Sequence, residues 1–203
     1  SAPVKFVWFP ATSEWLCATG GKIYRYNVSS SLKWTAATTT VAGVTDLCVF
    51  GTTVFAACGA SVAYKYSTDG ITWTTSTSAD DKATYFFVAP NSAGTAEVLW
   101  KAVTNELKNN TSGINGGAAW SSAAYIGDAS TNITNIFLVN DSLMIGKTDG
   151  QWYYDSDGGI HQLRPDLAKN ISTDNFKFTT EWSAGVYFSE INCMAEITTR
   201  NAY

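Results

Sequence analysis

Short runs of mostly apolar residues recur along the whole chain, separated by Gly, Asn, Asp and Ser. Residues 4–9 and 53–58 are nearly continuous in apolar side chains, whereas residues 72–77 mix Thr and Ser with a single Trp. Runs of this length between turn-forming residues are typical of β-strands. The pattern therefore predicts an all-β chain.

The strands fall into units that repeat along the sequence. Trp34 in "LKWTAAT" matches Trp73 in "ITWTTST" 39 residues later, and Trp120 follows after another 47. Residues 53–64 align without gaps on residues 142–153, about two repeats further on. The period is therefore roughly 40–47 residues, within the range of known repeat architectures. We expect equivalent, buried core positions at Tyr24, Tyr64 and Tyr153 and at Trp34, Trp73 and Trp120.

Each period reads as four short strands, which is the make-up of one blade of a β-propeller. The first two strands are apolar, as expected where neighbouring blades cover both faces, and the outer strands are more polar. A two-sheet sandwich would give irregular strand spacing. We therefore predict a β-propeller of about five four-stranded blades in one domain, the last blade incomplete. The expected blades are residues 4–40, 41–80, 81–130, 131–170 and 171–203.

Composition supports a globular β chain and excludes two classes of partner. The 203 residues are 45% hydrophobic, 14% aromatic and only 15% charged. The net charge of −4, without any cluster of Lys or Arg, argues against binding to nucleic acid. No apolar run approaches the roughly 18–20 residues that span a bilayer. We expect neither a nucleic-acid partner nor a membrane span.

The segment "YSTDGITWTT" (residues 66–75) contains a compact turn motif. Ser67, Asp69, Gly70 and Trp73 resemble the Asp-box of BNR-type propellers, with one residue fewer between Asp and Gly. The resemblance implies that the Asp side chain caps backbone N–H groups of the turn while the Trp packs beneath it, far from the propeller axis. An Asx turn with Gly at positive φ gives the same interpretation without the family. Asp69 is therefore expected to fold a loop and not to do chemistry.

A second stretch, residues 140–163 followed by residues 174–182, resembles repeat segments in propeller-type proteins of phage and environmental sequences. The resemblance implies a setting on a virion or an extracellular surface, without implying an activity.

Catalytic sets known on propellers are incomplete here. A sialidase needs three arginines to clamp a carboxylate, and Arg25, Arg164 and Arg200 are predicted on outer strands. A glycosidase of another type needs carboxylates on innermost strands, where Asp46 and Glu181 are the only candidates. Each lies at a strand end, where a structural role is expected. We predict no catalytic residues.

No cofactor or metal is expected. Asp149, Asp155 and Asp157 are spaced like a calcium loop, but Ca²⁺ needs six to eight oxygen ligands, and an ordinary Asp/Gly hairpin turn explains the spacing. The four cysteines lack a CxxC pair, and His161 is the single histidine, which argues against zinc. Either buried free thiols or a Cys17–Cys58 disulfide fits the pattern. The cysteines are Cys17, Cys48, Cys58 and Cys193.

Tyr and Trp residues invite a sugar-binding interpretation, but alternation places Tyr24 and Tyr26 on one face, where an adjoining blade would cover them. The leading hypothesis is a non-enzymatic surface or virion propeller that works through protein–protein or host-surface contacts. A secreted lectin and a propeller-type glycoside hydrolase are the alternatives. Expected partners are other copies of the chain, or virion and surface proteins, and potentially glycans. The unpaired edge of the last blade puts residues 194–203 at a contact.

Overall fold

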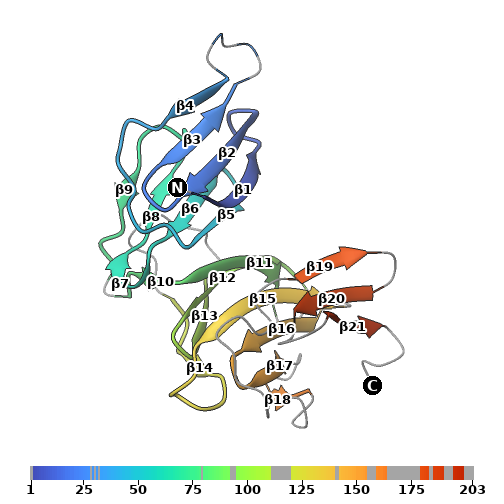
Figure 1. The fold of residues 1–203 in the computed structure, drawn as a ribbon. Helices are drawn as coiled ribbons and strands as arrows, with labels where there is room; N and C mark the ends of the chain where they lie inside the picture. The colour runs from blue at the N-terminus through green and yellow to red at the C-terminus, as the bar shows by residue number, and fades with distance from the viewer. Residues whose placement is uncertain are drawn as a thin grey trace. The chain divides into compact units, whose positions relative to one another are not determined.

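The computed structural model describes twenty-one β-strands and, within the described residues, no helix (Figure 1). No helix there could therefore cross a membrane. The described residues are 2–27, 29, 31, 33–78, 80–91, 95–110, 120–139, 142–154, 159–163, 179–182, 185–189 and 194–198.

Most strands form antiparallel sheets in which neighbours along the chain pair with each other. Among the described residues, four sheets have four strands and one has three, in agreement with the predicted all-β propeller of about five four-stranded units. Sheet 1 contains β1 (Pro3–Phe9), β2 (Glu14–Thr19), β3 (Ile23–Tyr26) and β4 (Trp34–Ala36). Sheet 2 contains β5 (Asp46–Phe50), β6 (Thr53–Ala57), β8 (Lys65–Ser67) and β9 (Thr74–Thr75).

The later sheets follow the same order. Sheet 3 contains β11 (Tyr85–Pro90), β12 (Glu97–Val103), β13 (Glu106–Asn110) and β14 (Ala124–Tyr125). Sheet 4 contains β15 (Ile133–Val139), β16 (Ser142–Lys147), β17 (Gly150–Tyr154) and β18 (Ile160–Gln162). Sheet 5 contains β19 (Thr179–Trp182), β20 (Gly185–Ser189) and β21 (Met194–Thr198).

The second blade departs from the expected strand pattern. Its third strand is β8, and β7 (Gly59–Ala63), which precedes β8 in the chain, pairs outside the sheet with β10 (Lys82–Ala83). Gly59 has φ +84°, a conformation that glycine adopts without strain, so the chain leaves β6 without a tight hairpin. The resulting insertion, β7, shifts the alignment of everything that follows it in this blade.

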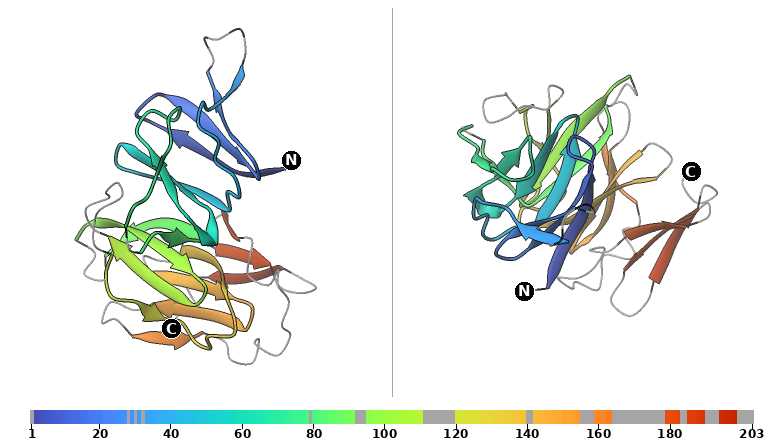
Figure 2. Two further views of the ribbon diagram at one scale, coloured as in Figure 1. Left: turned by 90° about the vertical axis from the view of Figure 1, so that its left-hand side faces the viewer. Right: turned by 90° about the horizontal axis from the view of Figure 1, so that it is seen from above.

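Two compact units divide the chain. One comprises residues 1–88, 98–103 and 108–122, and the other comprises residues 89–97, 104–107 and 123–203. In the first unit, sheet 1 lies against sheet 2 (Figures 1 and 2). Their shared core joins Phe9, Leu16 and Ala18 of sheet 1 to Leu47 and Val54 of sheet 2.

A second core of the first unit covers the other face of sheet 2. It contains Phe55, Tyr64 and Phe86, whose rings contact one another at tilted or edge-on angles. In the second unit, Phe137 and Met144 of sheet 4 pack with Val186 of β20. Sheets 2 and 4 therefore bury apolar side chains against the sheet that follows them in the chain, as propeller blades do.

Candidate functional site

The outer face of sheet 1 carries a row of aromatic side chains that crosses all four strands. Trp8 lies opposite Trp15, Trp15 opposite Tyr26, and Tyr26 opposite Trp34. Residues directly opposite each other share one face of a sheet. Ring centroids are 5.7 Å apart for Trp8 and Trp15 and 5.0 Å apart for Tyr26 and Trp34. The row therefore places four rings on one face of the sheet, with ring contacts at each of its two ends.

A second row of side chains runs beside the first and includes two small residues, Cys17 and Ala36. Phe6 lies opposite Cys17, Cys17 opposite Tyr24, and Tyr24 opposite Ala36. The ring of Phe6 contacts the ring of Trp34, with 6.1 Å between their centroids. We call these two rows the aromatic face. Its residues are Phe6, Trp8, Trp15, Cys17, Tyr24, Tyr26, Trp34 and Ala36.

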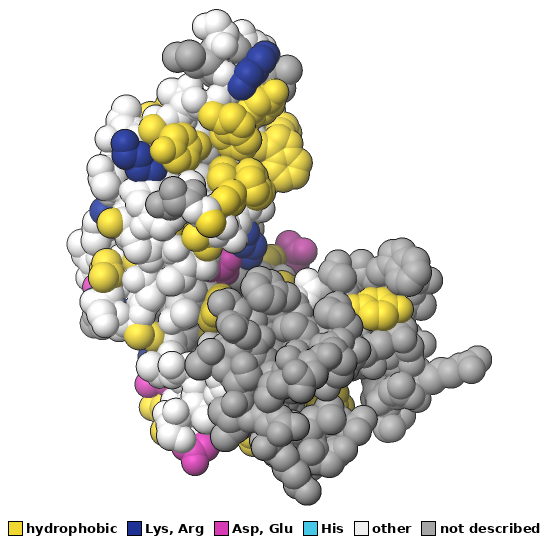
Figure 3. Space-filling view, viewed as in Figure 1, with side chains coloured by type: hydrophobic (Ala, Val, Ile, Leu, Met, Phe, Trp, Pro, Cys, Tyr) yellow, Lys and Arg dark blue, Asp and Glu magenta, His cyan; other side chains and the backbone are white. Residues whose placement is uncertain are grey.

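The large rings of the aromatic face are half exposed to solvent, whereas Cys17 in the same rows is buried. Phe6, Trp8, Trp15 and Trp34 are each 44–50% exposed, whereas the opposite face of sheet 1 is buried in the core shared with sheet 2. Figure 3 shows the hydrophobic side chains gathered on this part of the molecule. Exposed apolar patches of this kind mark interaction surfaces in soluble proteins.

The pairing registers show which face of sheet 2 is equivalent to the aromatic face. Lys5 pairs with Ala18 in sheet 1, and Asp46 pairs with Ala57 in sheet 2. The two hairpins then end at equivalent pairs, Phe9 with Glu14 and Phe50 with Thr53. On this alignment Phe6, Trp8, Trp15 and Cys17 correspond to Leu47, Val49, Val54 and Ala56.

Those residues of sheet 2 pack on sheet 1. Leu47, Val54 and Ala56 are fully buried there, and Val49 packs against the same core. Trp73 stands one residue before β9, opposite Ser67 when the register is continued, and so corresponds to Trp34. The aromatic face therefore occupies the side of sheet 1 that corresponds to the side of sheet 2 on which sheet 1 packs.

This register corrects part of the expected repeat core. Trp73 is buried, Trp120 is partly buried, and Trp34 is exposed, so the expectation that all three are buried is wrong for Trp34. Tyr64 lies outside the strands and is buried, and it does not correspond to Tyr24. The reason is the inserted β7, which displaces the sequence alignment.

The register shift caused by β7 also places Tyr26 and Tyr66 on opposite faces of their sheets. Tyr66 pairs with Phe55 and faces the core shared with sheet 3, whereas Tyr26 belongs to the aromatic face. Tyr153 pairs with Met144 and packs in the core of the second unit, so it corresponds to Tyr66. A one-residue slip moves a strand side chain to the other face of its sheet.

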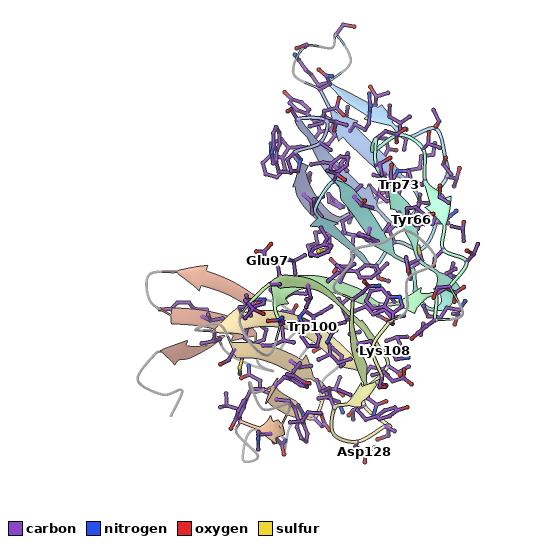
Figure 4. The ribbon with its side chains drawn as sticks, turned by 180° about the vertical axis from the view of Figure 1, so that it is seen from behind. Tyr66, Trp73, Glu97, Trp100, Lys108 and Asp128 are labelled. Atoms are coloured by element: carbon purple, nitrogen blue, oxygen red, sulfur yellow. The ribbon has the colours of Figure 1, made fainter. Side chains whose placement is uncertain are left out.

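The turn motif, whose Trp73 is labelled in Figure 4, folds as a hydrogen-bonded cap. Asp69 Oδ1 accepts hydrogen bonds from Ile71 N and Thr72 N, both at 2.7 Å. Ser67 Oγ donates to Asp69 Oδ1 at 2.9 Å and accepts from Gly70 N at 2.9 Å. Gly70 has φ +69°, and a Cβ there would meet Leu16 Cδ2 at 3.2 Å. Partial burial acts to raise the pKa of Asp69, but these hydrogen bonds outweigh it and lower the pKa.

The buried carboxylate of Asp46 connects the first strands of three sheets. Its carboxylate accepts hydrogen bonds from Lys5 Nζ at 2.6 Å, Leu47 N at 2.9 Å and Phe86 N at 2.9 Å. Burial raises the pKa of Asp46, while these three donors act in the opposite direction. Among the described residues its hydrogen-bond partners are the Lys5 ammonium and two backbone N–H groups, so the carboxylate is held as part of the core.

Sheet 4 repeats this arrangement 89 residues later. Asn135 Oδ1 accepts from Ile136 N at 2.9 Å, as Asp46 Oδ1 does from Leu47 N, and Asn135 Nδ2 donates to Thr179 Oγ1 of β19 at 2.9 Å. Both residues therefore join the first strand of their sheet to the first strand of the next. The sequence alignment of residues 53–64 on residues 142–153 has the same offset of 89 residues, but it did not indicate that these two residues connect neighbouring sheets.

Two buried lysines make a second set of repeated hydrogen bonds, which the sequence did not suggest. Lys101 Nζ donates to the carbonyl oxygens of Asp80 and Lys82, and Lys147 Nζ donates to those of Ile126 and Asp128. In both cases the acceptors lie 21 and 19 residues before the lysine. Each lysine also lies over an indole ring, Lys101 over Trp120 at 4.6 Å and Lys147 over Trp152 at 5.8 Å.

The charges around these lysines differ. Asp80 accepts from Lys101 Nζ at 2.8 Å and from Lys108 Nζ at 2.5 Å, whereas Asp149 lies 3.7 Å from Lys147 Nζ. Burial lowers the pKa of Lys101 and of Lys147, and the aspartates act in the opposite direction. Each lysine therefore connects its sheet, through these hydrogen bonds, to the segment that precedes the sheet in the chain.

The remaining candidates are placed as follows. Asp149 faces Lys147, Asp155 and Asp157 lie outside the described residues, and within the described residues no group of His, Cys, Asp and Glu could hold a metal ion. Arg25 is on β3, 3.5 Å from Glu14. The side chain of Glu181 and the residues Arg164, Arg200 and Cys193 lie outside the described part of the structure.

The three described cysteines are free thiols, so a Cys17–Cys58 disulfide is not formed. Burial, together with the charge of Asp46, raises the pKa of Cys48 to about 12. Burial also raises the pKa of Cys17 and Cys58. These thiols are therefore neutral packing groups.

Comparison with known proteins places the fold but no family. No family model and no curated protein matches the sequence. The chain is similar in structure to virginiamycin B lyase from Staphylococcus aureus, with 14% identity, a TM-score of 0.69, and coverage of 98% of this chain and 67% of the lyase chain. It is also similar to the extracellular domain of a putative one-component system from B. thetaiotaomicron, with 11% identity, a TM-score of 0.63, and coverage of 92% and 26%.

A glycoside hydrolase of family GH74 from Niastella koreensis is a further structural neighbour, with 17% identity, a TM-score of 0.55, and coverage of 96% of this chain and 30% of the enzyme. This chain therefore spans between about a quarter and two thirds of the length of these proteins. The neighbours include two enzymes and an extracellular domain, and at these identities they establish the β-propeller fold alone.

Proposed function

We propose that this chain is a non-enzymatic propeller at a virion or extracellular surface that works through protein–protein contacts made by the aromatic face. The observation that carries the proposal is the band formed by Trp8, Trp15, Tyr26 and Trp34, which lies open to solvent. Trp, Tyr and Phe are enriched in protein interfaces and supply most hot-spot residues. The surface setting rests on the phage-like segment at residues 140–163 and on the extracellular neighbour.

A sugar-binding role is less well supported by this face. Sugar and other small-ligand sites combine aromatic walls with several convergent polar groups. The aromatic face carries no charged side chain or amide, and its polar groups are the hydroxyl groups of Tyr24 and Tyr26 and the indole N–H groups of Trp8, Trp15 and Trp34. A flat, nearly uncharged aromatic surface suits another protein better than a glycan.

Enzymatic activity like that of the neighbours is also poorly supported. A histidine-to-alanine variant of the lyase neighbour is described as catalytically inactive. The single histidine of this chain, His161, lies on β18, the outermost strand of sheet 4, and its ring stacks on Tyr153 at 5.0 Å. The buried carboxylate of Asp46 is held by three donors in the core.

Site-specific photo-cross-linking tests the proposal. A benzophenone amino acid at position 15 should give defined protein adducts on the native surface, and excess unmodified chain should compete with them. The same group at position 125 is the matched control, because Tyr125 is exposed on β14 outside the aromatic face. Equal adducts from both positions, or glycan-array binding that Trp15→Ala abolishes, would overturn the proposal.

A further inference from the structure

Asp46 and Asn135 hold equivalent positions on the first strands of sheets 2 and 4, but only Asp46 can take up and release a proton. Asp46 accepts hydrogen bonds from Lys5 Nζ on β1 and from Phe86 N on β11. Asn135 instead donates from Nδ2 to Thr179 Oγ1 on β19. An amide is neutral and both donates and accepts, whereas a carboxylate only accepts until it is protonated. The contact made by Asp46 therefore depends on the charge of its side chain, and the contact made by Asn135 does not.

The two members of the ion pair differ in their access to water. Lys5 Nζ lies 2.6 Å from Asp46 Oδ1, and the side chain of Lys5 is 42% exposed, whereas that of Asp46 is 7% exposed. Without the negative charge, the ammonium group of Lys5 has solvent to turn into and loses no hydration by leaving. A protonated carboxyl group keeps acceptor capacity for a backbone N–H, such as that of Phe86. Lys5 is therefore the partner that protonation of Asp46 displaces.

The neighbouring titratable groups do not change charge in acidic solution. Within the described residues, the titratable groups that interact with Asp46 are Lys5 on β1, Cys48 on β5 and Tyr85 on β11. Burial and the charge of Asp46 raise the pKa of Cys48 to about 12, and they also raise the pKa of Tyr85. Both groups are therefore neutral in acid, and Lys5 carries the positive charge of the pair. Asp46 is the group of this cluster that acid neutralises.

We propose that Asp46 is a proton-controlled link between the first strands of sheets 1, 2 and 3, in which protonation of its carboxyl group releases Lys5 and loosens β1 from β5. The proton comes from solvent and Lys5 keeps its own, so the pair changes from neutral to singly positive. All these groups belong to the first compact unit. The contact of Asn135 with Thr179, between sheets 4 and 5, lacks a titrating group and stays as it is.

This release does not require unfolding. Burial raises the folded-state pKa of Asp46, against the opposing effect of Lys5 and the backbone donors, so the folded protein binds the proton more tightly than the unfolded chain. As the pH falls through the folded-state pKa towards the unfolded-state value of about 3.9, the contribution of this group to the free energy of unfolding therefore rises. The apolar core shared by sheets 1 and 2 contains no titrating side chain apart from the thiol of Cys58. Acid therefore changes a local contact in a protein that stays folded.

NMR titration of the full chain tests the proposal. The signal of the Asp46 carboxyl carbon should titrate with a midpoint above about 3.9, and the backbone amide of Phe6 on β1 should shift with the same midpoint. In Asp46→Asn the Phe6 amide should no longer shift there. Lys5→Met should move the carboxyl midpoint to higher pH, because it removes the cation that favours the charged form. A carboxyl midpoint at or below about 3.9, or a Phe6 amide that does not follow it, would overturn the proposal.

The equivalent position in sheet 4 supplies the matched control. Ile136 N donates to Asn135 Oδ1 as Leu47 N donates to Asp46 Oδ1, both at 2.9 Å. In the wild-type chain the Leu47 amide should therefore shift with the carboxyl midpoint and the Ile136 amide should not. Asn135→Asp should make the Ile136 amide titrate as well, and circular dichroism confirms that each variant is folded. An Ile136 amide that titrates in the wild-type chain with the midpoint of Leu47 would refute a link specific to Asp46.

Discussion

Trp34 and Trp73 occupy the same position in consecutive sheets, yet Trp34 is 44% exposed and Trp73 is 3% exposed. Trp73 is buried because sheet 1 lies against its side of sheet 2, where it shares a core with Phe9 and Leu16. Trp34 projects from the other side of sheet 1, which faces away from sheet 2. The same residue type therefore serves as core in one sheet and as surface in the other.

Substitution of the two tryptophans should separate these roles. We expect Trp73→Ala to lower the free energy of unfolding by about 3–5 kcal/mol, because it empties a large volume in a packed core. Trp34→Ala should lower it by less than about 1 kcal/mol, since its ring is half exposed. Chemical denaturation of both variants and the wild type measures the difference. Equal losses would show that the two positions are buried alike in solution.

The cap at Asp69 should contribute to stability without affecting binding. We expect Asp69→Ala to cost on the order of 1 kcal/mol, because Ile71 N and Thr72 N lose their acceptor. Binding through the aromatic face should not change, since the turn lies outside it. Thr68→Ala, an exposed change in the same turn, is the control for altering the loop. Denaturation curves of Asp69→Ala that overlay the wild type at pH 7 would contradict the prediction.

The contribution of Asp69 should also depend on pH. Its folded-state pKa is lowered, so the stabilisation is present in full above the unfolded-state pKa of about 3.9. It is lost as the pH falls below that value through the lower folded-state pKa, because both states are then protonated. The stability difference between wild type and Asp69→Ala should therefore shrink between about pH 4 and about pH 2. A difference that is constant over this range would exclude an ionised cap.

The two buried lysines should contribute strongly to the free energy of unfolding, because they donate hydrogen bonds as well as carrying a charge. Lys101→Met keeps the length of the side chain but leaves the carbonyl oxygens of Asp80 and Lys82 without this donor. We expect a loss of roughly 3–5 kcal/mol, the range for breaking a buried ion pair. Lys147→Met removes two similar bonds and should behave in the same way. Lys22→Met, at an exposed lysine, is the control and should be nearly neutral, as measured by thermal unfolding.

Replacement of Asp46 by Asn should destabilise the protein less than replacement by Ala. Asp46→Ala leaves the buried N–H groups of Leu47 and Phe86 without acceptors, and each costs about 1–3 kcal/mol. Asp46→Asn keeps one side-chain oxygen, as Asn135 does at the equivalent position of sheet 4. We therefore expect Asp46→Asn to be the more stable of the two in urea denaturation. The opposite order would contradict the prediction, because both variants lose the carboxylate charge and only Asp46→Asn keeps an acceptor.

The local features of this chain could be predicted from sequence because they depend on neighbours along the chain. The residue types of the Ser67–Trp73 turn, with Gly70 at positive φ, set its hydrogen bonds within a few residues. The strand pattern and the four-stranded period follow from alternating apolar runs and turns, which lie close together in sequence. The shared offset of Asp46 and Asn135 was likewise visible, as a gapless alignment of nearby residues.

Sequence alone determined that the chain is all-β, that it repeats in four-stranded units, and that Asp69 lies in a structural turn. Only the tertiary structure decided which aromatic residues are core and which are surface. The insertion of β7 shifts the register of the third strand, and one residue of shift moves a side chain to the opposite face. Burial then depends on whether another sheet lies against that face. This contact between residues distant in sequence places Trp73 inside and leaves Trp8, Trp15 and Trp34 on the surface.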